Sequence, residues 1–294
     1  MSRALSLQLM KGLLCFLVSL FLLSGCVKNN PDPVWLKITP WTLVGNPDLV
    51  NVEGELSQNF SDAWVYVNDK IIGVFELPVK IPVLESGTCN IKIYPAVRNN
   101  GISSTKKMYP FVKRYELTAE LIPNSTFTID PVTMYDSNTQ FWIEDFEDAA
   151  VKINTDQYSA DTMLVGTDPA IMKWNRYGIS TLNAIDSTWI AYTSEGLALP
   201  KGQEVYLELD YYNTNSMVTG VLAIVGGVPQ NNIHVRLNAQ KLSEVRWKKM
   251  YIDLREIVSN SAGANTFLIS LQAALDEENS EGIIILDNIK VVHF

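Results

Sequence analysis

The stretch Val205-Tyr-Leu-Glu-Leu-Asp210 decides the fold class of this chain, because its apolar and polar residues alternate. Val205, Leu207 and Leu209 fall on one side of an extended strand, and the residues between them fall on the other. The runs at 63–67 and 233–237 alternate in the same way. Short alternating runs that are separated by Gly, Pro, Asn and Asp predict an antiparallel, all-β protein.

The chain divides into two expected domains. Turn-forming residues gather between about 121 and 140, where Pro123-Asn124-Ser125 and Pro131-Val132-Thr133 occur. We therefore expect a first domain over 35–130 and a second over 131–294. The helical pieces that we expect are short, such as residues 254–259.

The composition favours a folded chain and argues against one class of partner. Hydrophobic residues make up 47% of the 294 residues, which is enough for a sizeable core. Acids outnumber bases by 32 to 23, for a net charge of −9. Nucleic-acid binding depends on lysine and arginine at phosphates, so we expect no nucleic-acid partner.

The first residues have the pattern of a targeting segment. A basic start is followed by an apolar run over 12–23, and the sequence then reads Leu23-Ser24-Gly25-Cys26. This box resembles the lipobox of bacterial lipoproteins. The resemblance implies that residues 1–25 are a signal peptide, that Cys26 carries diacylglycerol and palmitate-type acyl chains, and that 26–34 is a tether. The alternative is an ordinary signal peptide with an incidental cysteine.

The sequence around the predicted lipid anchor also suggests a cellular location. Val27 follows the cysteine where an aspartate retains lipoproteins in the inner membrane, so the start resembles an outer-membrane lipoprotein of the Bacteroidota type. Either face of the outer membrane is open. Removal of residues 1–25, which carry two bases and no acid, changes the net charge from −9 to −11. Membrane attachment would therefore depend on the acyl chains at Cys26.

Cys89 is the one thiol left in the folded part after this processing. An internal disulfide is then impossible. Cys89 is in phase with Ile91 and Ile93, which predicts a buried, structural cysteine.

The first domain resembles small β-sandwich modules. Asn68-Asp69 separates two apolar runs and predicts a β-hairpin, and Gly73, Pro78 and Gly87 follow. This order resembles PEGA-type or carboxypeptidase-regulatory-like modules, which have immunoglobulin-like folds. The resemblance implies a spacer or an adhesive module.

The second domain resembles another family through its two ends. It opens with Asp145-Phe146-Glu147 and closes with Leu286-Asp287-Asn288-Ile289. These elements look like those of the galactose-binding-like jelly roll of many carbohydrate-binding modules. The resemblance implies a jelly-roll β-sandwich and a glycan as a candidate ligand.

Three acids in this domain form a candidate metal site. Asp145 and Glu147 are in phase with Phe141 and Ile143, and Asp287 is in phase with Ile289. Carboxylates on a core-side face need a partner. If the first and last strands are neighbours, the three acids could bind a structural calcium ion. Alternatively, these acids face solvent or bond to loop amides.

Glycan binding also needs exposed aromatic rings, since the C–H faces of sugars stack on them. Tyr212 and two nearby amides, Asn213 and Asn215, accompany the main aromatic candidates. These are Trp174, Tyr177, Trp189, Tyr211 and Trp247. The alternative is that these rings belong to the core.

No GxSxG, HExxH, Walker A or GxGxxG motif is present, and the chain has only two histidines. Ser103-Ser104-Thr105-Lys106 fits SxxK formally, but no KTG or SDN partner follows. We therefore expect no enzyme. The leading hypothesis is a lipid-anchored interaction subunit of an envelope protein complex. The alternative is a glycan-binding lipoprotein that uses its jelly roll, and a weaker alternative is a carboxylate-pair glycoside hydrolase.

Overall fold

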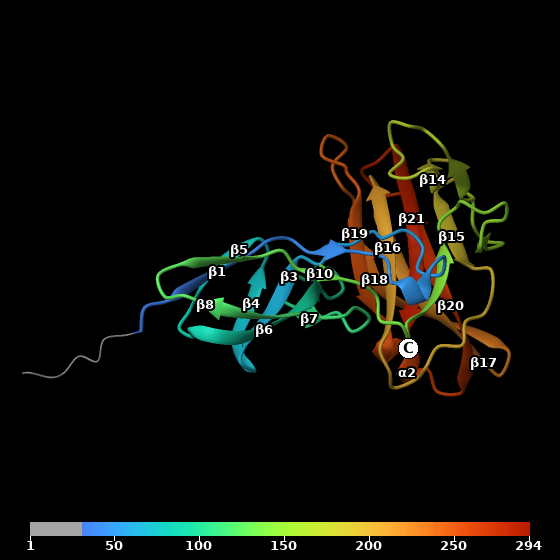
Figure 1. The fold of residues 1–294 in the computed structure, drawn as a ribbon. Helices are drawn as coiled ribbons and strands as arrows, with labels where there is room; N and C mark the ends of the chain where they lie inside the picture. The colour runs from blue at the N-terminus through green and yellow to red at the C-terminus, as the bar shows by residue number, and fades with distance from the viewer. Residues whose placement is uncertain (1–30) are drawn as a thin grey trace, which may run out of the picture.

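The structure, a computed structural model, describes residues 31–294. These residues are almost entirely β-strands and form two domains side by side (Figure 1), so the all-β prediction is confirmed. Cys26 and residues 1–25 lie outside the described residues, and their predicted processing stays a prediction. Within 31–294, no helix is long and apolar enough to span a bilayer.

The N-terminal domain is a β-sandwich. One sheet has the strand order β5-β1-β9, and the other has the order β4-β3-β6-β7, with β8 also paired to β6. A short pair joins β2 and β10. The elements are β1 (Val34–Ile38), β2 (Thr42–Leu43), η1 (Pro47–Leu49), β3 (Asp62–Val67), β4 (Lys70–Glu76), β5 (Val79–Val83), β6 (Gly87–Arg98), β7 (Lys106–Met108), β8 (Tyr115–Leu121), β9 (Thr126–Ile129) and β10 (Val132–Thr133).

Two predictions for this domain are confirmed. Asn68 and Asp69 join β3 to β4 with φ values of 50° and 62°. Two successive positive φ values are those of the type I′ turn that suits a two-residue hairpin. Cys89 lies on β6, is 0% exposed, and is a free thiol in the core of this sandwich.

The C-terminal domain is a second sandwich of two sheets. The β21 sheet has the order β13-β14-β21-β16-β19, with β11 also paired to β21, and the β20 sheet has the order β12-β15-β20-β17-β18. The elements are β11 (Gln140–Glu144), β12 (Ile153–Thr155), β13 (Leu164–Gly166), β14 (Tyr177–Asn183), β15 (Thr188–Thr193), β16 (Val205–Asn213), β17 (Met217–Val225), β18 (Val228–Leu237), β19 (Lys248–Asp253), α2 (Arg255–Asn260), β20 (Ala264–Ala274) and β21 (Glu281–His293).

The passage between the domains falls between Thr133 and Gln140. β10 still pairs with β2 of the first sandwich, whereas β11 pairs with β21 of the second. In the second sandwich, Val205, Leu207 and Leu209 point into the core, as their alternation predicts. The short helix α2 closes one end of this core through Val258.

The predicted single face of β21 is wrong beyond Asp287. Relative to β16, β21 carries one extra residue between Asp287 and Lys290. Asn288 lies in this bulge with a φ of 47°. The alternation therefore changes phase, and Ile289 and Val291 point into the core while Asp287 stays on the outer side.

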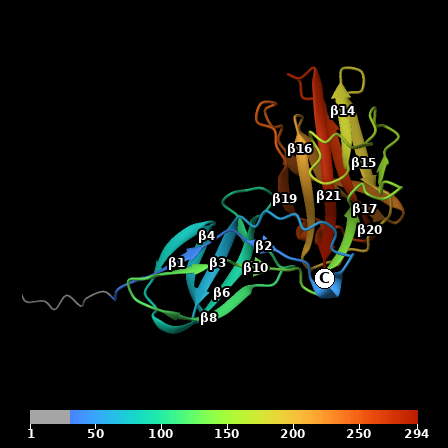
Figure 2. The same cartoon turned by 45° about the horizontal axis from the view of Figure 1, so that its top comes forward.

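Part of the outer face of the β21 sheet, at Tyr206, Tyr251 and Val292, packs against the N-terminal domain, which lies beside the jelly roll in Figure 2. Tyr109 packs edge-to-face on Tyr206 of β16, with ring centroids 5.3 Å apart, and lies 4.9 Å from the ring of Tyr251 on β19. Phe111 also packs on Tyr206. All four side chains are buried, so the two domains share one apolar contact.

Charged groups are buried in the same interface. Glu208 of β16 accepts hydrogen bonds from the hydroxyls of Tyr109 and Tyr135, and it lies 2.9 Å from Lys249 Nζ. Burial acts to raise the pKa of Glu208, but Lys249 and Lys290 hold it below its ordinary value. A buried carboxylate with this many partners is a structural group.

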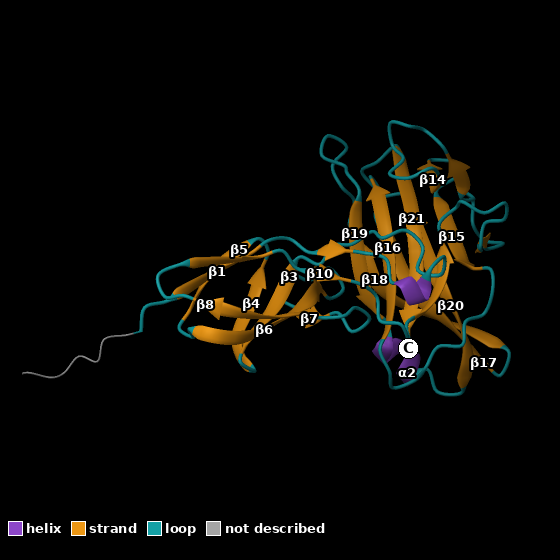
Figure 3. Cartoon of the chain, in the orientation of Figure 1, coloured by secondary structure: helices purple, strands orange, loops and turns teal. Residues whose placement is uncertain are grey.

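Lys290 fixes a loop of the first domain onto this face. The loop that carries η1 crosses the β21 sheet in Figure 3, and Lys290 Nζ donates hydrogen bonds to the backbone carbonyls of Glu53 and Glu55. Lys290 is 0% exposed, and burial lowers its pKa to about 8. This part of the jelly-roll face is therefore closed to ligands.

Candidate functional site

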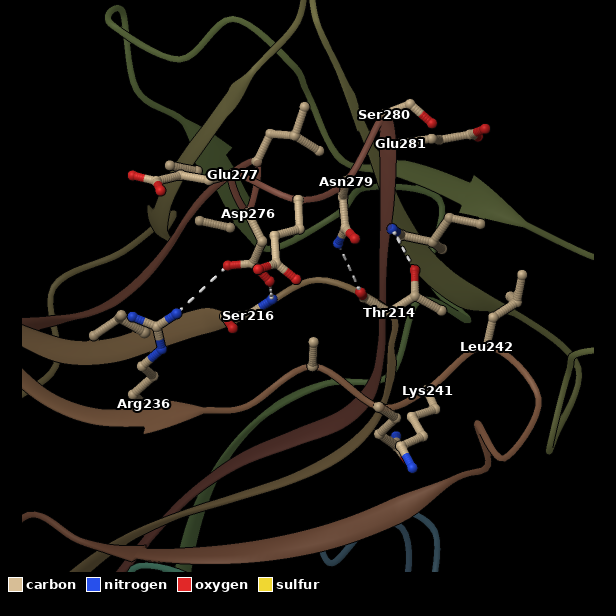
Figure 4. A pocket seen from close by; sticks show the side chains of 18 residues that line it. Thr214, Ser216, Arg236, Lys241, Leu242, Asp276, Glu277, Asn279, Ser280 and Glu281 are labelled. Atoms are coloured by element: carbon tan, nitrogen blue, oxygen red, sulfur yellow. Dashed lines mark hydrogen bonds and ion pairs between the residues drawn. The ribbon is translucent and has the colours of Figure 1, made fainter.

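An open cleft lies at the end of the jelly roll where β16 ends and β21 begins (Figure 4). Its volume is ≈1040 Å³. Two loops form its walls, residues 238–247 between β18 and β19 and residues 275–280 between β20 and β21. Thr214 and Ile283 lie at the end of the β21 sheet, and Val218 and Arg236 lie at the end of the β20 sheet.

A buried amide holds the cleft loops in place. Asn215 is 0% exposed, its Nδ2 donates to the Ala274 carbonyl at 2.8 Å, and its Oδ1 accepts from the Asp276 amide at 2.8 Å. Gly282 lies against this side chain, and a Cβ at Gly282 would come within 2.6 Å of it. Asn215 therefore joins the loop after β16 to the loop after β20, which sets the shape of the cleft.

Further hydrogen bonds inside the cleft fix a few side chains (Figure 4). Asp276 accepts from the Ser216 amide at 2.7 Å and lies 3.4 Å from Arg236. Thr214 accepts from the Ile283 amide at 3.0 Å, and Asn279 donates to the Thr214 carbonyl at 3.4 Å. These hydrogen bonds fix the orientation of the Asp276, Thr214 and Asn279 side chains on the cleft wall.

Other charged side chains of the cleft are free of such bonds. Among the described residues, no hydrogen bond or ion pair involves the side chains of Lys241, Glu277, Glu278 or Glu281, all of which are exposed. Four acids and two bases line the cleft. The cleft is therefore acidic, with donors and acceptors available to a polar ligand.

Three aromatic side chains of this domain are partly exposed, and none of them lines the cleft. Tyr212 and Trp247 have ring centroids 6.1 Å apart, and Trp247 Nε1 donates to the Ile171 carbonyl at 2.7 Å. Trp174 follows on the same loop as Ile171, with Lys173 Nζ 4.2 Å from its ring centroid. Trp247 also belongs to the 238–247 loop that walls the cleft. Trp247 is therefore near the cleft wall, because Gln240, which lines the cleft, donates from Nε2 to the carbonyl of Arg246 at 3.0 Å.

The aromatic residues that we predicted to bind a ligand fall into two groups, partly exposed and buried. Trp174 and Trp247 are partly exposed, and neither lines the cleft. Trp189 is 0% exposed and Tyr211 is 7% exposed, and both belong to the jelly-roll core. Tyr177 is also buried. These three rings present no plane to solvent, because they fill the sandwich and its covered face.

The three proposed calcium ligands do not form a metal-binding group. Among residues 31–294, no set of three His, Cys, Asp or Glu side chains is placed to hold a metal ion. β11 ends at Glu144, and Phe146 adopts a φ of 59° and enters the core, which leaves Glu147 exposed. Glu147 instead accepts a hydrogen bond from the Arg176 amide.

One observation at this place still fits a bound cation. Asp287 Oδ2 and Asn288 Oδ1 are buried oxygens without a hydrogen-bond partner among the described residues. Burial, with Asp210, Asp145 and Glu147 nearby, raises the pKa of Asp287 to about 8. Calcium at Asp287 therefore stays a prediction, with Asn288 in place of part of the predicted set.

Sequence reasoning did not find the cleft itself. Arg236, Lys241 and Asp276 come from three separate segments, and none of them belongs to a motif. The only feature of the sequence that could have indicated the cleft is that turn-rich segments follow β16, β18 and β20, which end at the same end of the domain.

The comparisons with known proteins give fold likenesses only. No family model matches the chain, and no curated protein matches it. Among solved structures, the enzymatically active domain of tailspike protein 4 from bacteriophage CBA120 is similar, at 13% identity and a TM-score of 0.35 over 50% of this chain. The match spans 20% of that longer chain.

Two other similar structures are carbohydrate-binding modules. The CBM28 module specific for non-crystalline cellulose matches at 12% identity and a TM-score of 0.37, over 50% of this chain and 90% of its own. The family 11 module of a cellulosomal cellulase from Clostridium thermocellum matches at 14% identity and a TM-score of 0.35, over 52% of this chain and 95% of its own. Likenesses this weak do not establish a shared function.

Proposed function

We propose that this chain is a non-catalytic, lipid-anchored outer-membrane protein that binds a glycan at the loop end of its jelly roll. The observation that carries the proposal is the open polar cleft, with the partly exposed Trp247 on the loop that forms one of its walls. A binding site needs convergent polar groups to orient a ligand and flat apolar surface to hold it.

The chemistry of the cleft suits a polyhydroxylated ligand. Carboxylates such as Glu281 accept hydrogen bonds from sugar hydroxyls, and Lys241 donates them. The indole of Trp247 offers an apolar ring with its polar N–H already bonded to the Ile171 carbonyl, so its orientation is fixed. Because four acids outnumber two bases, we expect neutral or amino sugars rather than uronic acids.

The contact between the two domains suggests that the first is a spacer and the second carries the binding site. The N-terminal sandwich is fixed to the jelly roll through buried side chains such as Tyr109 and Glu208. The described chain starts at the end of that sandwich remote from the jelly roll (Figure 1). With lipid at Cys26, the first domain would hold the cleft away from the membrane as a stiff spacer, on whichever face of the outer membrane it occupies.

Binding to an array of immobilised glycans tests this function. We expect the full chain to bind a group of neutral or amino glycans, and Trp247→Ala to lose at least about tenfold in affinity, as central aromatic contacts do. Tyr158→Ala is the matched control, because Tyr158 is 77% exposed and lies between β12 and β13, at the sheet edges opposite β18 and β19. Failure of the properly folded chain to bind any glycan would overturn the proposal.

The interaction-subunit hypothesis has one specific observation in its favour. Leu242 on the cleft wall is 78% exposed, and Ile185 in the β14–β15 loop at the same end is 87% exposed. Protein contacts use contiguous apolar patches, and in this hypothesis Leu242 and Ile185 belong to one. Affinity purification from native membranes tests it: a stoichiometric partner that is lost in Leu242→Asp would support it, and recovery of the chain alone would argue against it.

A further inference from the structure

The loop that carries η1 (Figure 3), residues 45–56, encloses a hollow that is separate from the cleft. The volume of this hollow is ≈610 Å³. Every residue that lines it belongs to this loop, and none of them lines the cleft. Lys290 donates hydrogen bonds to the backbone carbonyls of Glu53 and Glu55, which holds the loop in place. The chain therefore has a second fixed concave surface, which we call the η1 hollow.

Glu53, which lines the η1 hollow, has a buried carboxylate with an unused acceptor. The residue is 7% exposed, and its Oε1 accepts a hydrogen bond from the Asn46 amide at 3.0 Å. Its Oε2 is buried and has no hydrogen-bond partner within residues 31–294. Burial raises the pKa of this carboxyl, although the Asn46 amide and Lys290 act against the rise. A buried carboxylate oxygen without a donor is costly, so this side chain favours a ligand that donates hydrogen bonds.

Gly45 leaves the space beside this carboxylate open. Its φ lies outside the left-handed region that favours glycine, so the backbone does not require a glycine here. A Cβ at Gly45 would lie 3.2 Å from Glu53 Oε1 and 3.9 Å from Leu56 Cδ1. Gly45 is itself exposed, so a ligand can approach the carboxylate past it. The terminal torsion of a glutamate is broad, which lets the carboxylate turn toward a donor on this side.

The charged and apolar side chains of the η1 hollow define the kind of group that it fits. Val50 and Leu56 line it and are 65% and 36% exposed. Two acids, Glu53 and Glu55, are among its lining residues, and no base is. A primary ammonium on an apolar stem matches both features, because its three N–H groups donate to acids and its methylene groups pack on apolar side chains.

A metal ion fits these residues less well than an ammonium. Calcium takes about six to eight oxygen ligands. Within residues 31–294, no set of three His, Cys, Asp or Glu side chains is placed to hold a metal ion. An ammonium needs at most three acceptors, which one carboxylate and neighbouring carbonyls supply. The η1 hollow therefore favours an amine.

We infer that the η1 hollow binds a lysine side chain of a partner protein, with the ammonium on Glu53 and the methylene groups on Val50 and Leu56. Exposed apolar surface continues beyond the hollow at Val52, which is 52% exposed, and a small amine would leave it uncovered. The charges are complementary, because an acidic hollow on a chain of net charge −9 meets a basic side chain. The inference does not depend on the proposed glycan site, since the hollow and the cleft share no residue.

Titration of the isotope-labelled, detergent-solubilised full chain with Nα-acetyl-lysine methylamide tests the hollow by NMR. We expect saturable shifts of the amides at 45–56, and none with the norleucine analogue, which has the same stem without the ammonium. Glu53→Gln should weaken binding at least about tenfold, because it removes the charge but keeps an acceptor for the Asn46 amide. Gly45→Ala should also weaken binding, because its methyl group fills the approach. Glu256→Gln is the matched control, since Glu256 is exposed and does not line the hollow.

Carbodiimide crosslinking in native membranes shows whether the amine belongs to a protein. This reagent joins a carboxylate to a lysine amine in contact with it, so we expect an amide bond between Glu53 and a lysine of another protein. The bond should be absent in Glu53→Gln and unchanged in Glu256→Gln. The inference is overturned if the lysine analogue shifts no amide at 45–56, if Glu53→Gln binds it equally well, or if Glu53 couples to no lysine outside this chain. Binding of spermidine or glucosamine in the hollow, without such a bond, would also overturn it.

Discussion

Acidic and basic side chains occur both on the outer face of the β21 sheet and in the cleft at its end, but those on the outer face have bonded partners and most of those in the cleft have none among the described residues. On the outer face of β16, Glu208 lies among Lys249 and two tyrosine hydroxyls and is 0% exposed. Beyond the end of that strand, in the cleft, Glu278 and Lys241 are exposed and have no bonded partner among the described residues. Partnered charges hold the two domains together, and free charges remain available to a ligand.

The largest effect should come from the covered region. Glu208→Gln removes the nearer of two carboxylates that compensate buried Lys249, whose Nζ lies 2.9 Å from Glu208 and 3.8 Å from Asp210. Loss of a buried ion-pair partner costs about 3–5 kcal/mol. We expect urea unfolding of this variant to show that decrease in the free energy of unfolding. A change below about 1 kcal/mol would mean that the interface charges do not stabilise the structure.

A pH effect should follow from Lys290. Because burial lowers its pKa to about 8 from 10.5, the folded chain releases a proton that the unfolded chain retains between these pH values. The free energy of unfolding should therefore rise as pH increases through this window, by up to about 2 kcal/mol between pH 8 and 9.5. Lys290→Met should lack this contribution, and an identical pH dependence in both proteins would contradict it.

Calcium would add a third, smaller effect at the border of the covered face. If an ion binds the unpartnered oxygens of Asp287 and Asn288, chelation should lower the melting temperature by about 2–4 °C, equivalent to about 1 kcal/mol for a domain of this size. Asp287→Asn should be insensitive to chelation. An unchanged melting temperature after metal analysis has shown complete removal would exclude the ion.

The smallest effect is expected in the cleft. Glu278→Gln makes the same chemical change as Glu208→Gln, but at an exposed side chain without a bonded partner. We expect the free energy of unfolding to stay within about 0.5 kcal/mol of the parent value. A loss comparable to that of Glu208→Gln would show that the two regions do not differ as the structure indicates.

Much of the fold could be predicted from the period of two, but not its interruptions. The alternation at Val205, Leu207 and Leu209 correctly indicates an inward-facing strand. The bulge at Asn288 shifts the alternation by one residue, and Asp287-Asn288 is too short a signal within an apolar run to predict it. Phe146 likewise leaves the strand phase by adopting a positive φ.

The candidate site was less accessible to sequence reasoning, because burial of an aromatic ring depends on what covers its strand. Trp189 and Trp247 both lie in or next to alternating segments, yet Trp189 is 0% exposed and Trp247 is partly exposed. The cleft combines loops that are distant in sequence and joined through Asn215. Such a surface exists only once both sheets have formed.

Hydrogen exchange with and without the best array glycan tests the contrast between the two regions most directly. We predict that bound glycan slows amide exchange in the cleft loops at 238–247 and 275–280 and around Thr214, and leaves exchange unchanged at the η1 loop, 45–56, and at Glu208. Protection of the η1 loop or of β16 near Glu208, without protection of the cleft loops, would contradict the account.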